Sequence, residues 1–242
     1  MVELCIDEKK IYEIIKKYKP KKVLVQAPAG LKRKIVTILQ DIENKTKTEF
    51  IISADTCFGA CDIPLGAIEV IKPDITIHIG HLKMVNIGKI FYLPAKYEFT
   101  QDEKKDILNI LLDKLKSEHI SKIVGTASVQ YLDLLYWLVF EAKKNNVDIT
   151  IKKGVCGKKG LILGCNVNAA MNKSKIVLFI GDGEFHAVGI AKSLNKEVLL
   201  LDPLSKKISW LKFDSKKFAK KRNVLMLKVR SAKNFGLVFS TK

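Results

Sequence analysis

The sequence predicts two tandem α/β domains, each built on a parallel sheet, because three features of the chain agree. Short apolar runs alternate with amphipathic helical patterns, an order typical of parallel βαβ units. The same order of runs begins again about one hundred residues later, which indicates an internal duplication. Each copy also carries a cysteine in an equivalent loop. We therefore predict a first domain at 1–98, a second at 99–205 and a further segment at 206–242.

In the first copy, the apolar runs predict strands and the periodic segments between them predict helices. An amphipathic helix is expected at 8–18, where Ile11, Ile14 and Ile15 share one face. The expected strands are 23–25, 50–52, 75–80 and 90–93, and the further helices are 31–42 and 63–71.

In the second copy, a charged helix at 101–118 leads into the repeated pattern. The expected strands are 123–128, 149–151, 176–181 and 198–203, with a helix at 131–142. Beyond them, a basic helix is expected at 215–233. Residues 235–242 resemble 23–26 and 123–126, which predicts the first strand of a truncated third domain. The alternative is an edge strand that closes the second sheet.

Composition indicates a soluble globular protein, because 48% of the 242 residues are hydrophobic and 28% are charged. No apolar run is long enough for a membrane span, and the amino terminus lacks the pattern of a signal peptide. We expect a cytoplasmic protein whose five cysteines serve metal binding, redox chemistry or burial rather than disulfides. The net charge of +18 favours polyanionic partners, but the lysines are spread along the chain and accompany no RNA-binding motif.

Two cysteines, Cys57 and Cys61, follow the strand at 50–52 in a tight turn. Asp62 is expected to cap the next helix, with Pro64 in its first turn. Thiols at the end of a strand and the start of a helix lie where open α/β sheets bind ligands. The alternative is a pair of buried structural thiols, since cysteine is often buried.

Cys165 falls in the loop of the second copy that matches the loop of Cys61. Two such domains and the start of a third suggest a ligand held on a pseudo-threefold axis. Three thiolates and one open position suit a [4Fe-4S] cluster whose fourth iron binds substrate. The one-loop CxxxCxxC motif of radical enzymes is absent, because Pro64 stands at its third cysteine position. The ligands therefore have to come from distant parts of the sequence.

Several motifs together resemble those of the diphthamide-synthesis radical enzyme family, and they cover almost the whole chain. The similar segments are 55–62 (DTCFGACD, family YGACD), 77–81 (IHIGH, family HYGH), 163–166 (LGCN, family LGC) and 181–189 (GDGEFHAVG, family GxFHxLG). Residues 201–203 and the basic stretch from 222 to 236 match further landmarks of the family.

This resemblance implies three homologous α/β domains that together bind a [4Fe-4S] cluster through one cysteine each. It implies transfer of the 3-amino-3-carboxypropyl group of S-adenosylmethionine to a histidine of elongation factor two, the first step of diphthamide biosynthesis. By the same resemblance, the cluster would donate an electron, and the aminocarboxypropyl radical formed from S-adenosylmethionine would add to the imidazole. Carried onto this chain, the cluster ligands are Cys61 and Cys165, whereas Cys57 has no ligand role in the resemblance.

The family's third cluster ligand lies in a third domain, of which this chain has almost none. Cys5 and Cys156 are poor substitutes, because neither occupies the equivalent loop. Three explanations are open: another chain supplies the missing domain, the gene is split or truncated, or this copy does not work alone. We favour a separate chain that supplies the third ligand, docked on the strand edge left open by the third copy. The resemblance also implies a homodimer, and an electron donor is required.

The other candidate cofactor-binding residues lie at strand ends or at a helix start. Gln26 and Gln130 could line an adenosine pocket. The backbone amides of 181–183 and the side chain of His186 could hold the methionine carboxylate, as helix N-termini hold anions. The full set is Gln26, His81, Gln130, Gly181, Gly183 and His186.

Two other kinds of function stay open. Cys57, Cys61, His78 and His81 could form a Cys₂His₂ zinc site in a structural or regulatory protein. That site leaves Cys165 unexplained, and it requires His78, which we expect to be a hydrogen-bonded core residue, to leave the core face. A basic RNA-binding module without catalytic activity would fit the charge but not the placement of the cysteines.

Overall fold

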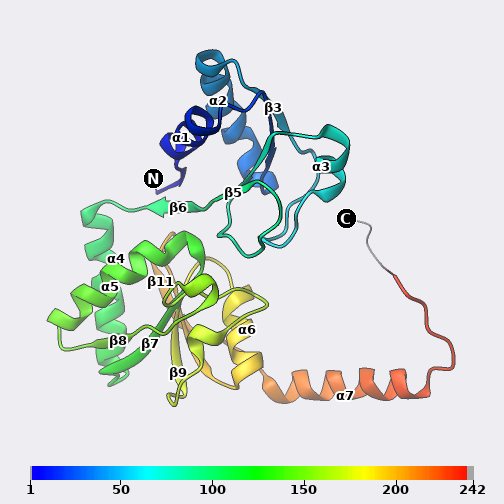
Figure 1. The fold of residues 1–242 in the computed structure, drawn as a ribbon. Coiled ribbons are helices and arrows are strands. Elements are labelled where there is room, and N and C mark those ends of the chain that lie inside the picture. The colour runs from blue at the N-terminus through cyan, green and yellow to red at the C-terminus, as the bar shows by residue number, and fades with distance from the viewer. Residues whose placement is uncertain (1, 239–242) are drawn as a thin grey trace. The chain divides into compact units, whose positions relative to one another are not determined.

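The computed structural model describes residues 2–238, which fold into two compact units (Figure 1). The first unit comprises the chain up to Phe99, and the second begins at Thr100. Within the described residues, no helix is both long and apolar enough to cross a membrane.

The first unit is a four-stranded sheet in the order β3-β2-β4-β5, with all neighbours parallel. Its strands are β2 (Lys22–Gln26), β3 (Glu49–Ile52), β4 (Ile75–Ile79) and β5 (Ile90–Leu93). Its helices are α1 (Glu8–Tyr18), α2 (Ala29–Thr46) and α3 (Leu65–Ile71). The sequence did not predict a small antiparallel pair formed by β1 (Glu3–Ile6) and β6 (Ala95–Glu98).

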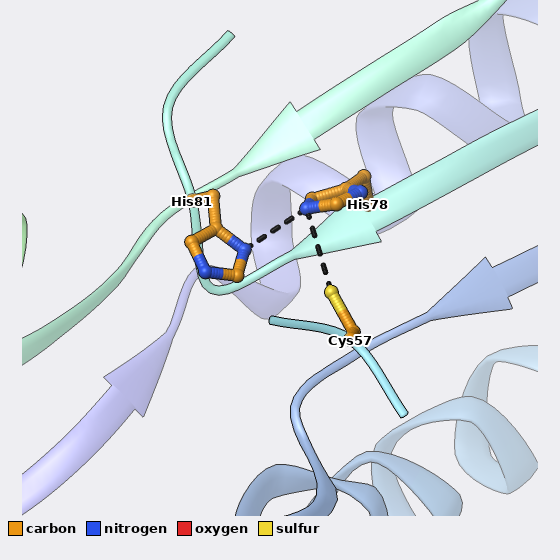
Figure 2. Close-up of side chains that lie close together, drawn as sticks. All are labelled: Cys57, His78 and His81. Atoms are coloured by element: carbon orange, nitrogen blue, oxygen red, sulfur yellow. Dashed lines mark hydrogen bonds between the residues drawn. The ribbon is translucent and has the colours of Figure 1, made fainter. Parts of the chain in front are cut away.

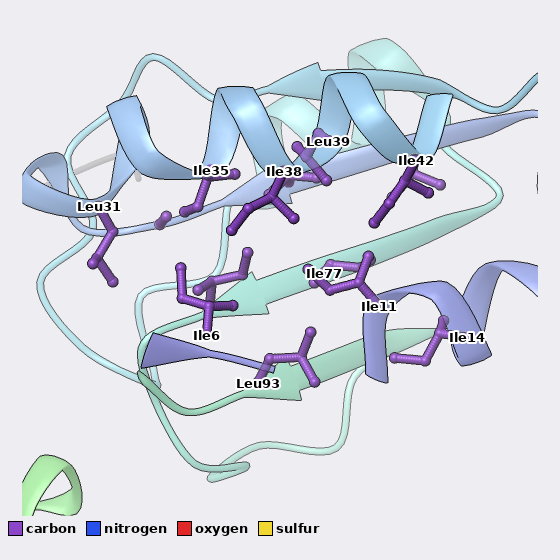
Figure 3. Close-up of a cluster of buried hydrophobic side chains, with 14 of the residues drawn as sticks. Ile6, Ile11, Ile14, Leu31, Ile35, Ile38, Leu39, Ile42, Ile77 and Leu93 are labelled. Atoms are coloured by element: carbon purple, nitrogen blue, oxygen red, sulfur yellow. The ribbon is translucent and has the colours of Figure 1, made fainter. Parts of the chain in front are cut away.

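The core of the first unit lies between the sheet and helices α1 and α2 (Figure 3). Ile11, Ile14 and Ile15 of α1 are buried, as their spacing predicts. They meet Ile35 of α2 and Ile77 of β4, which are fully inaccessible to solvent. This packing fixes the sheet, so the loops at its carboxyl edge are held on a rigid support.

The second unit has the sheet order β8-β7-β9-β10-β11, in which only β11 is antiparallel. Its strands are β7 (Lys122–Ala127), β8 (Asp148–Thr150), β9 (Ile176–Ile180), β10 (Glu197–Asp202) and β11 (Lys207–Trp210). Its α-helices are α4 (Gln101–Ser117), α5 (Leu132–Lys144), α6 (Phe185–Leu194) and α7 (Ser215–Ser231). Short 3₁₀ turns are η1 (Val129–Tyr131), η2 (Val155–Gly157) and η3 (Asn168–Ala170).

The two sheets repeat one topology, because β8, β7, β9 and β10 follow the same order as β3, β2, β4 and β5. The predicted α/β fold with parallel sheets is therefore confirmed. The copies differ after the strand that precedes the cysteine loop. The first copy has helix α3 there, whereas the second has an irregular stretch with η2 and η3.

Two details differ from the sequence predictions. Helix α3 begins at Leu65, and Asp62 does not cap it: the Asp62 carboxylate accepts a hydrogen bond from the Phe58 amide instead. The edge of the second sheet is closed by β11. Residues 235–238 form no strand, and the rest of the strand predicted at 235–242 lies outside the described residues.

Replacing Gly125 of β7 with alanine is expected to lower the free energy of unfolding by about 1–3 kcal/mol, because the core there has no room for a methyl group. A Cβ at this position would lie 2.6 Å from Cγ2 of Ile149 and 2.9 Å from Cδ1 of Leu135. Gly30 in α2 is the control: a Cβ there meets no atom within 4 Å, so Gly30→Ala should not lower stability. Urea denaturation of both variants measures the difference, and equal stabilities would contradict the tight packing at β7.

Candidate functional site

The predicted site residues follow the carboxyl ends of the parallel strands in each unit, the edge where open α/β sheets bind ligands. In the first unit, Gln26 ends β2, the cysteine turn follows β3, and His81 follows β4. In the second unit, Gln130 lies in η1 after β7, and His186 lies in the first turn of α6 after β9.

The turn that carries Cys61 is held by contacts from three directions. Its Asp62 amide donates to the Gly59 carbonyl, while the hydroxyl of Tyr92 in β5 donates to the Ala60 carbonyl at 3.2 Å. Before the turn, the ammonium group of Lys32 in α2 donates to the carbonyls of residues 54 and 55, at 2.7 Å each. Cys61 itself is exposed. The first unit thus presents this thiol from an anchored turn.

A second group of side chains lies at the same edge of the first sheet (Figure 2). His78 Nε2 lies 2.9 Å from His81 Nδ1 and 3.9 Å from Cys57 Sγ. Gly80 makes this arrangement possible, because its φ of +99° turns the chain after β4 and brings His81 back toward His78. His78 is fully buried, as the sequence predicts, and from that position it already faces the thiol. The prediction that it would have to leave the core to meet Cys57 is therefore wrong.

The group consists of three residues, Cys57, His78 and His81, and Cys61 does not belong to it. The Cys₂His₂ set considered from the sequence is therefore not assembled in the described residues.

Burial favours the neutral form of both imidazoles. Burial lowers the pKa of His78 to about 4, with a smaller contribution from His81 in the same direction. Burial also lowers the pKa of His81. The Asp62 carboxylate acts in the opposite direction on both groups and so favours positive charge at this position. Neutral imidazole is the form that binds metal ions.

Gln26 is fully buried, and neither its side-chain nitrogen nor its side-chain oxygen has a hydrogen-bond partner in the described structure. It pairs with His78 in the register of β2 and β4, so the two side chains lie on the same face of the sheet. Nδ1 of His78 is likewise buried without a partner. Burying polar atoms without hydrogen-bond partners lowers the stability of the folded state. Their presence at this edge of the first sheet therefore indicates a role other than packing.

Cys165 lies at the tip of a tight turn in the second unit. The backbones of Leu163 and Asn166 exchange two hydrogen bonds, 2.8 and 3.0 Å long, which leaves Gly164 and Cys165 as the central residues. The segment leading into this turn pairs with the carboxyl end of β7 through Leu161. The Cys165 side chain is exposed, like that of Cys61 in the first unit.

The start of α6 packs against this turn. A Cβ on Gly164 would lie 2.3 Å from the ring of Phe185, so glycine allows that ring to lie on the turn. His186 follows, with its ring 5.2 Å from that of Phe185 and 5.8 Å from that of Phe179. Burial lowers the pKa of His186, opposed by Asp182, so its imidazole can donate a hydrogen bond rather than a positive charge.

The glycines predicted to bind the methionine carboxylate lie at the same edge. The amide of Gly181 donates a hydrogen bond to the Leu201 carbonyl at 3.1 Å, so this amide is already used within the second sheet. Gly183 has a φ of +71° and lies in the loop before α6.

The sequence analysis missed Lys32 and Tyr92, which hold the Cys61 turn, and Phe185, which packs on the Cys165 turn. Their roles come from hydrogen bonds to backbone carbonyls and from ring contacts, and neither leaves a motif in the sequence. It also did not single out Cys57, His78 and His81 as a set of three.

Each cysteine turn by itself offers the kind of ligand that an iron–sulfur cluster needs. Such clusters are held by cysteine thiolates, and both Cys61 and Cys165 expose a thiol at the tip of a hydrogen-bonded turn. Neither thiol is committed to a disulfide.

By fold and site, the chain is a duplicated parallel α/β protein with one exposed cysteine turn in each copy. It belongs to the family of diphthamide synthesis proteins, because the family model described as "Putative diphthamide synthesis protein" matches residues 27–242.

Relatives and solved structures agree with this assignment. The chain is 34% identical over 237 residues to 2-(3-amino-3-carboxypropyl)histidine synthase of Methanocaldococcus jannaschii, covering 91% of this chain and 63% of the relative. It is 29% identical to the synthase of Pyrococcus horikoshii, covering 98% of this chain and 68% of the relative. The crystal structure of Dph2 from Pyrococcus horikoshii with a 4Fe-4S cluster matches with a TM-score of 0.83 and 28% identity, over 96% of this chain and 68% of that one. The chain thus spans about two thirds of the length of these archaeal relatives.

Proposed function

We propose that this chain is the cysteine-bearing two-domain part of a 2-(3-amino-3-carboxypropyl)histidine synthase, which uses a [4Fe-4S] cluster and S-adenosylmethionine to modify a histidine of elongation factor two. The observation that carries this proposal is the match of 96% of the chain to a Dph2 structure that holds a 4Fe-4S cluster, together with an exposed cysteine turn in each unit. Cys61 and Cys165 would supply two of the thiolate ligands.

When bound and reduced, the cluster supplies the electron that breaks the bond between the sulfonium and the γ-carbon of S-adenosylmethionine. The residues of this chain hold the reactants around that step. The anchored turns keep the two thiolates in place. The neutral imidazole of His186 can donate a hydrogen bond to the methionine carboxylate, as can backbone amides before α6 such as that of Gly183. Gln130 is the candidate for a contact to the adenosine, because Gln26 is fully buried and His81 faces His78.

The third thiolate would come from protein outside these 242 residues. The first unit has Cys5 in β1 and the second has Cys156 in η2, and neither lies in a turn equivalent to that of Cys61 or Cys165. In this proposal a separate chain carries the third cysteine. A homodimer of the complete assembly and an external electron donor complete the proposed partners.

The test is the iron and sulfide content of the chain, purified anaerobically alone and after co-expression with the product of the neighbouring gene. We expect a brown chain that loses iron readily when alone, and a stable four-iron cluster with transfer from S-adenosylmethionine to elongation factor two in the complex. A chain that takes up neither iron nor sulfide in both cases would overturn the cluster proposal. A stable, active cluster in the isolated chain would overturn only the need for a separate chain.

A further inference from the structure

The polar group at the edge of the first sheet is not demanded by the fold, because the second unit fills the equivalent positions differently. Gln26 and His78 pair in the first sheet, and Thr126 and Phe179 pair in the second. The hydroxyl of Thr126 donates to the Leu178 carbonyl at 2.9 Å, and Phe179 is a fully buried apolar ring. The same topology thus holds two different pairs. In the second unit the Thr126 hydroxyl has a hydrogen-bond partner, whereas in the first unit both side-chain polar atoms of Gln26 and Nδ1 of His78 are buried without one. The buried polar pair of Gln26 and His78 therefore indicates a role besides packing.

We propose that Cys57, His78 and His81 bind one divalent metal ion of the zinc type through Sγ, Nε2 and Nδ1, at a site separate from the cluster ligands Cys61 and Cys165. These three ligand atoms all lie within 4.8 Å of one another. The site leaves one coordination position for water or another small ligand, as zinc sites with three protein ligands do.

The distances suit a tetrahedral ion after shifts of up to about 1 Å. Bonds of about 2.3 Å to sulfur and about 2.0–2.1 Å to nitrogen place the ligand atoms of a tetrahedron roughly 3.3–3.6 Å apart. The two imidazole nitrogens lie 2.9 Å apart and the sulfur lies 3.9 Å from His78 Nε2. A metal ion would push the nitrogens apart and draw the thiolate toward His78 by a few tenths of an ångström each. The thiolate and His81 Nδ1, which lie within 4.8 Å of one another, would have to approach by up to about 1.2 Å. The metal ion would therefore replace the hydrogen bond between the two imidazoles.

The surroundings favour a cation. Two neutral imidazoles and one thiol need to lose only the thiol proton, which passes to solvent as the metal binds. The Asp62 carboxylate is near enough to favour positive charge at both imidazoles. Cys57 and His78 are buried, which shields the bonds from competing water.

Metal binding would also give Gln26 a role. With Nε2 of His78 on the metal, the ring proton has to sit on Nδ1, which is buried. Histidine ligands usually donate this second N–H to a carbonyl, a carboxylate or water. The side-chain oxygen of Gln26, on the neighbouring strand and equally buried, is the acceptor that the sheet offers. Gln26 is therefore a positioning residue for the metal ligand His78.

The test uses the full-length chain with both proposed cluster ligands replaced, Cys61→Ser and Cys165→Ser, titrated anaerobically with Co²⁺ as a coloured substitute for zinc. We expect one Co²⁺ per chain, with intense visible bands of tetrahedral geometry and a thiolate-to-cobalt charge-transfer band. Adding Cys57→Ser should abolish the charge-transfer band and weaken binding by more than about 100-fold, beyond the range for outer-shell partners. Adding Cys156→Ser, at an exposed cysteine of the second unit, is the matched control and should change neither.

Gln26→Met gives a readout that does not depend on a metal ligand. It should weaken Co²⁺ binding by about 10–100-fold, as loss of an outer-shell partner does. The metal-free variant should melt no lower than its parent, because methionine fills the site without unpartnered polar atoms. Binding unchanged by Cys57→Ser, or no stoichiometric binding in the parent, would overturn the site. Unchanged affinity in Gln26→Met would overturn the role of Gln26. Because the cluster ligands are absent throughout, these outcomes are independent of the iron content that tests the proposed function.

Discussion

In the complex with the chain that supplies the third cysteine, serine at Cys61 or at Cys165 is expected to reduce the iron and sulfide content to background and the transfer reaction by more than about 100-fold. The physical reason is the ligand itself. Iron–sulfur clusters require soft thiolates, and a serine hydroxyl stays protonated at neutral pH and binds iron weakly. Anaerobic reconstitution followed by iron and sulfide analysis measures the first effect, and labelled S-adenosylmethionine with elongation factor two measures the second.

The two serine variants should fold normally, which makes the result interpretable. Both side chains are exposed at the tips of turns, where substitutions usually change stability by less than about 0.5 kcal/mol. Cys156→Ser, at another exposed cysteine, is the control and should keep full iron content. If either Cys61→Ser or Cys165→Ser kept a stable cluster, the replaced cysteine would not be a cluster ligand in this protein.

The sheets were predictable because parallel strands are buried on both faces and appear in the sequence as plain apolar runs, such as Ile75–Ile79. The antiparallel pair of β1 and β6 was not. Its strands are four residues long and mix charged with apolar side chains, as in 95–98 (AKYE), so they carry no periodic signal. The start of α3 was misplaced because Asp62 looks like a cap, while its carboxylate instead closes the cysteine turn onto the Phe58 amide.

Part of the candidate site was also predictable from the apolar strands. Cysteines at the ends of strands can be read directly, because the carboxyl edge of a parallel sheet is a known place for ligands. The meeting of Cys57 with His78 and His81 depends on the backbone angle of Gly80 and on the register of neighbouring strands. Sequence spacing alone sets neither of these. His78 was correctly predicted to be buried, and Cys57 and His81 were considered as its partners only in a set of four that also included Cys61.

Replacing Phe179 with alanine is expected to lower the free energy of unfolding by about 3–5 kcal/mol and to raise the pKa of His186 toward its ordinary value. The ring is fully buried between the sheet and α6, and a Cβ on Gly181 would lie 2.6 Å from it, so the neighbouring backbone is built around this ring. Removing it leaves a cavity beside His186, whose lowered pKa is caused by burial, and water entering there would stabilise the imidazolium. Urea denaturation and NMR titration measure the two effects.

Phe140→Ala in α5 is the matched control for Phe179→Ala. Its ring is 64% exposed, so the same truncation should cost little and should leave the pKa of His186 unchanged. Measuring both the free energy of unfolding and the His186 pKa separates the effect of Phe179 on stability from its effect on His186. Lost stability with an unchanged His186 pKa would mean that the core closes over the cavity and that His186 is buried by other groups. A raised pKa would mean that a single core ring keeps the imidazole neutral, which is the state needed to donate a hydrogen bond to a carboxylate without adding a charge.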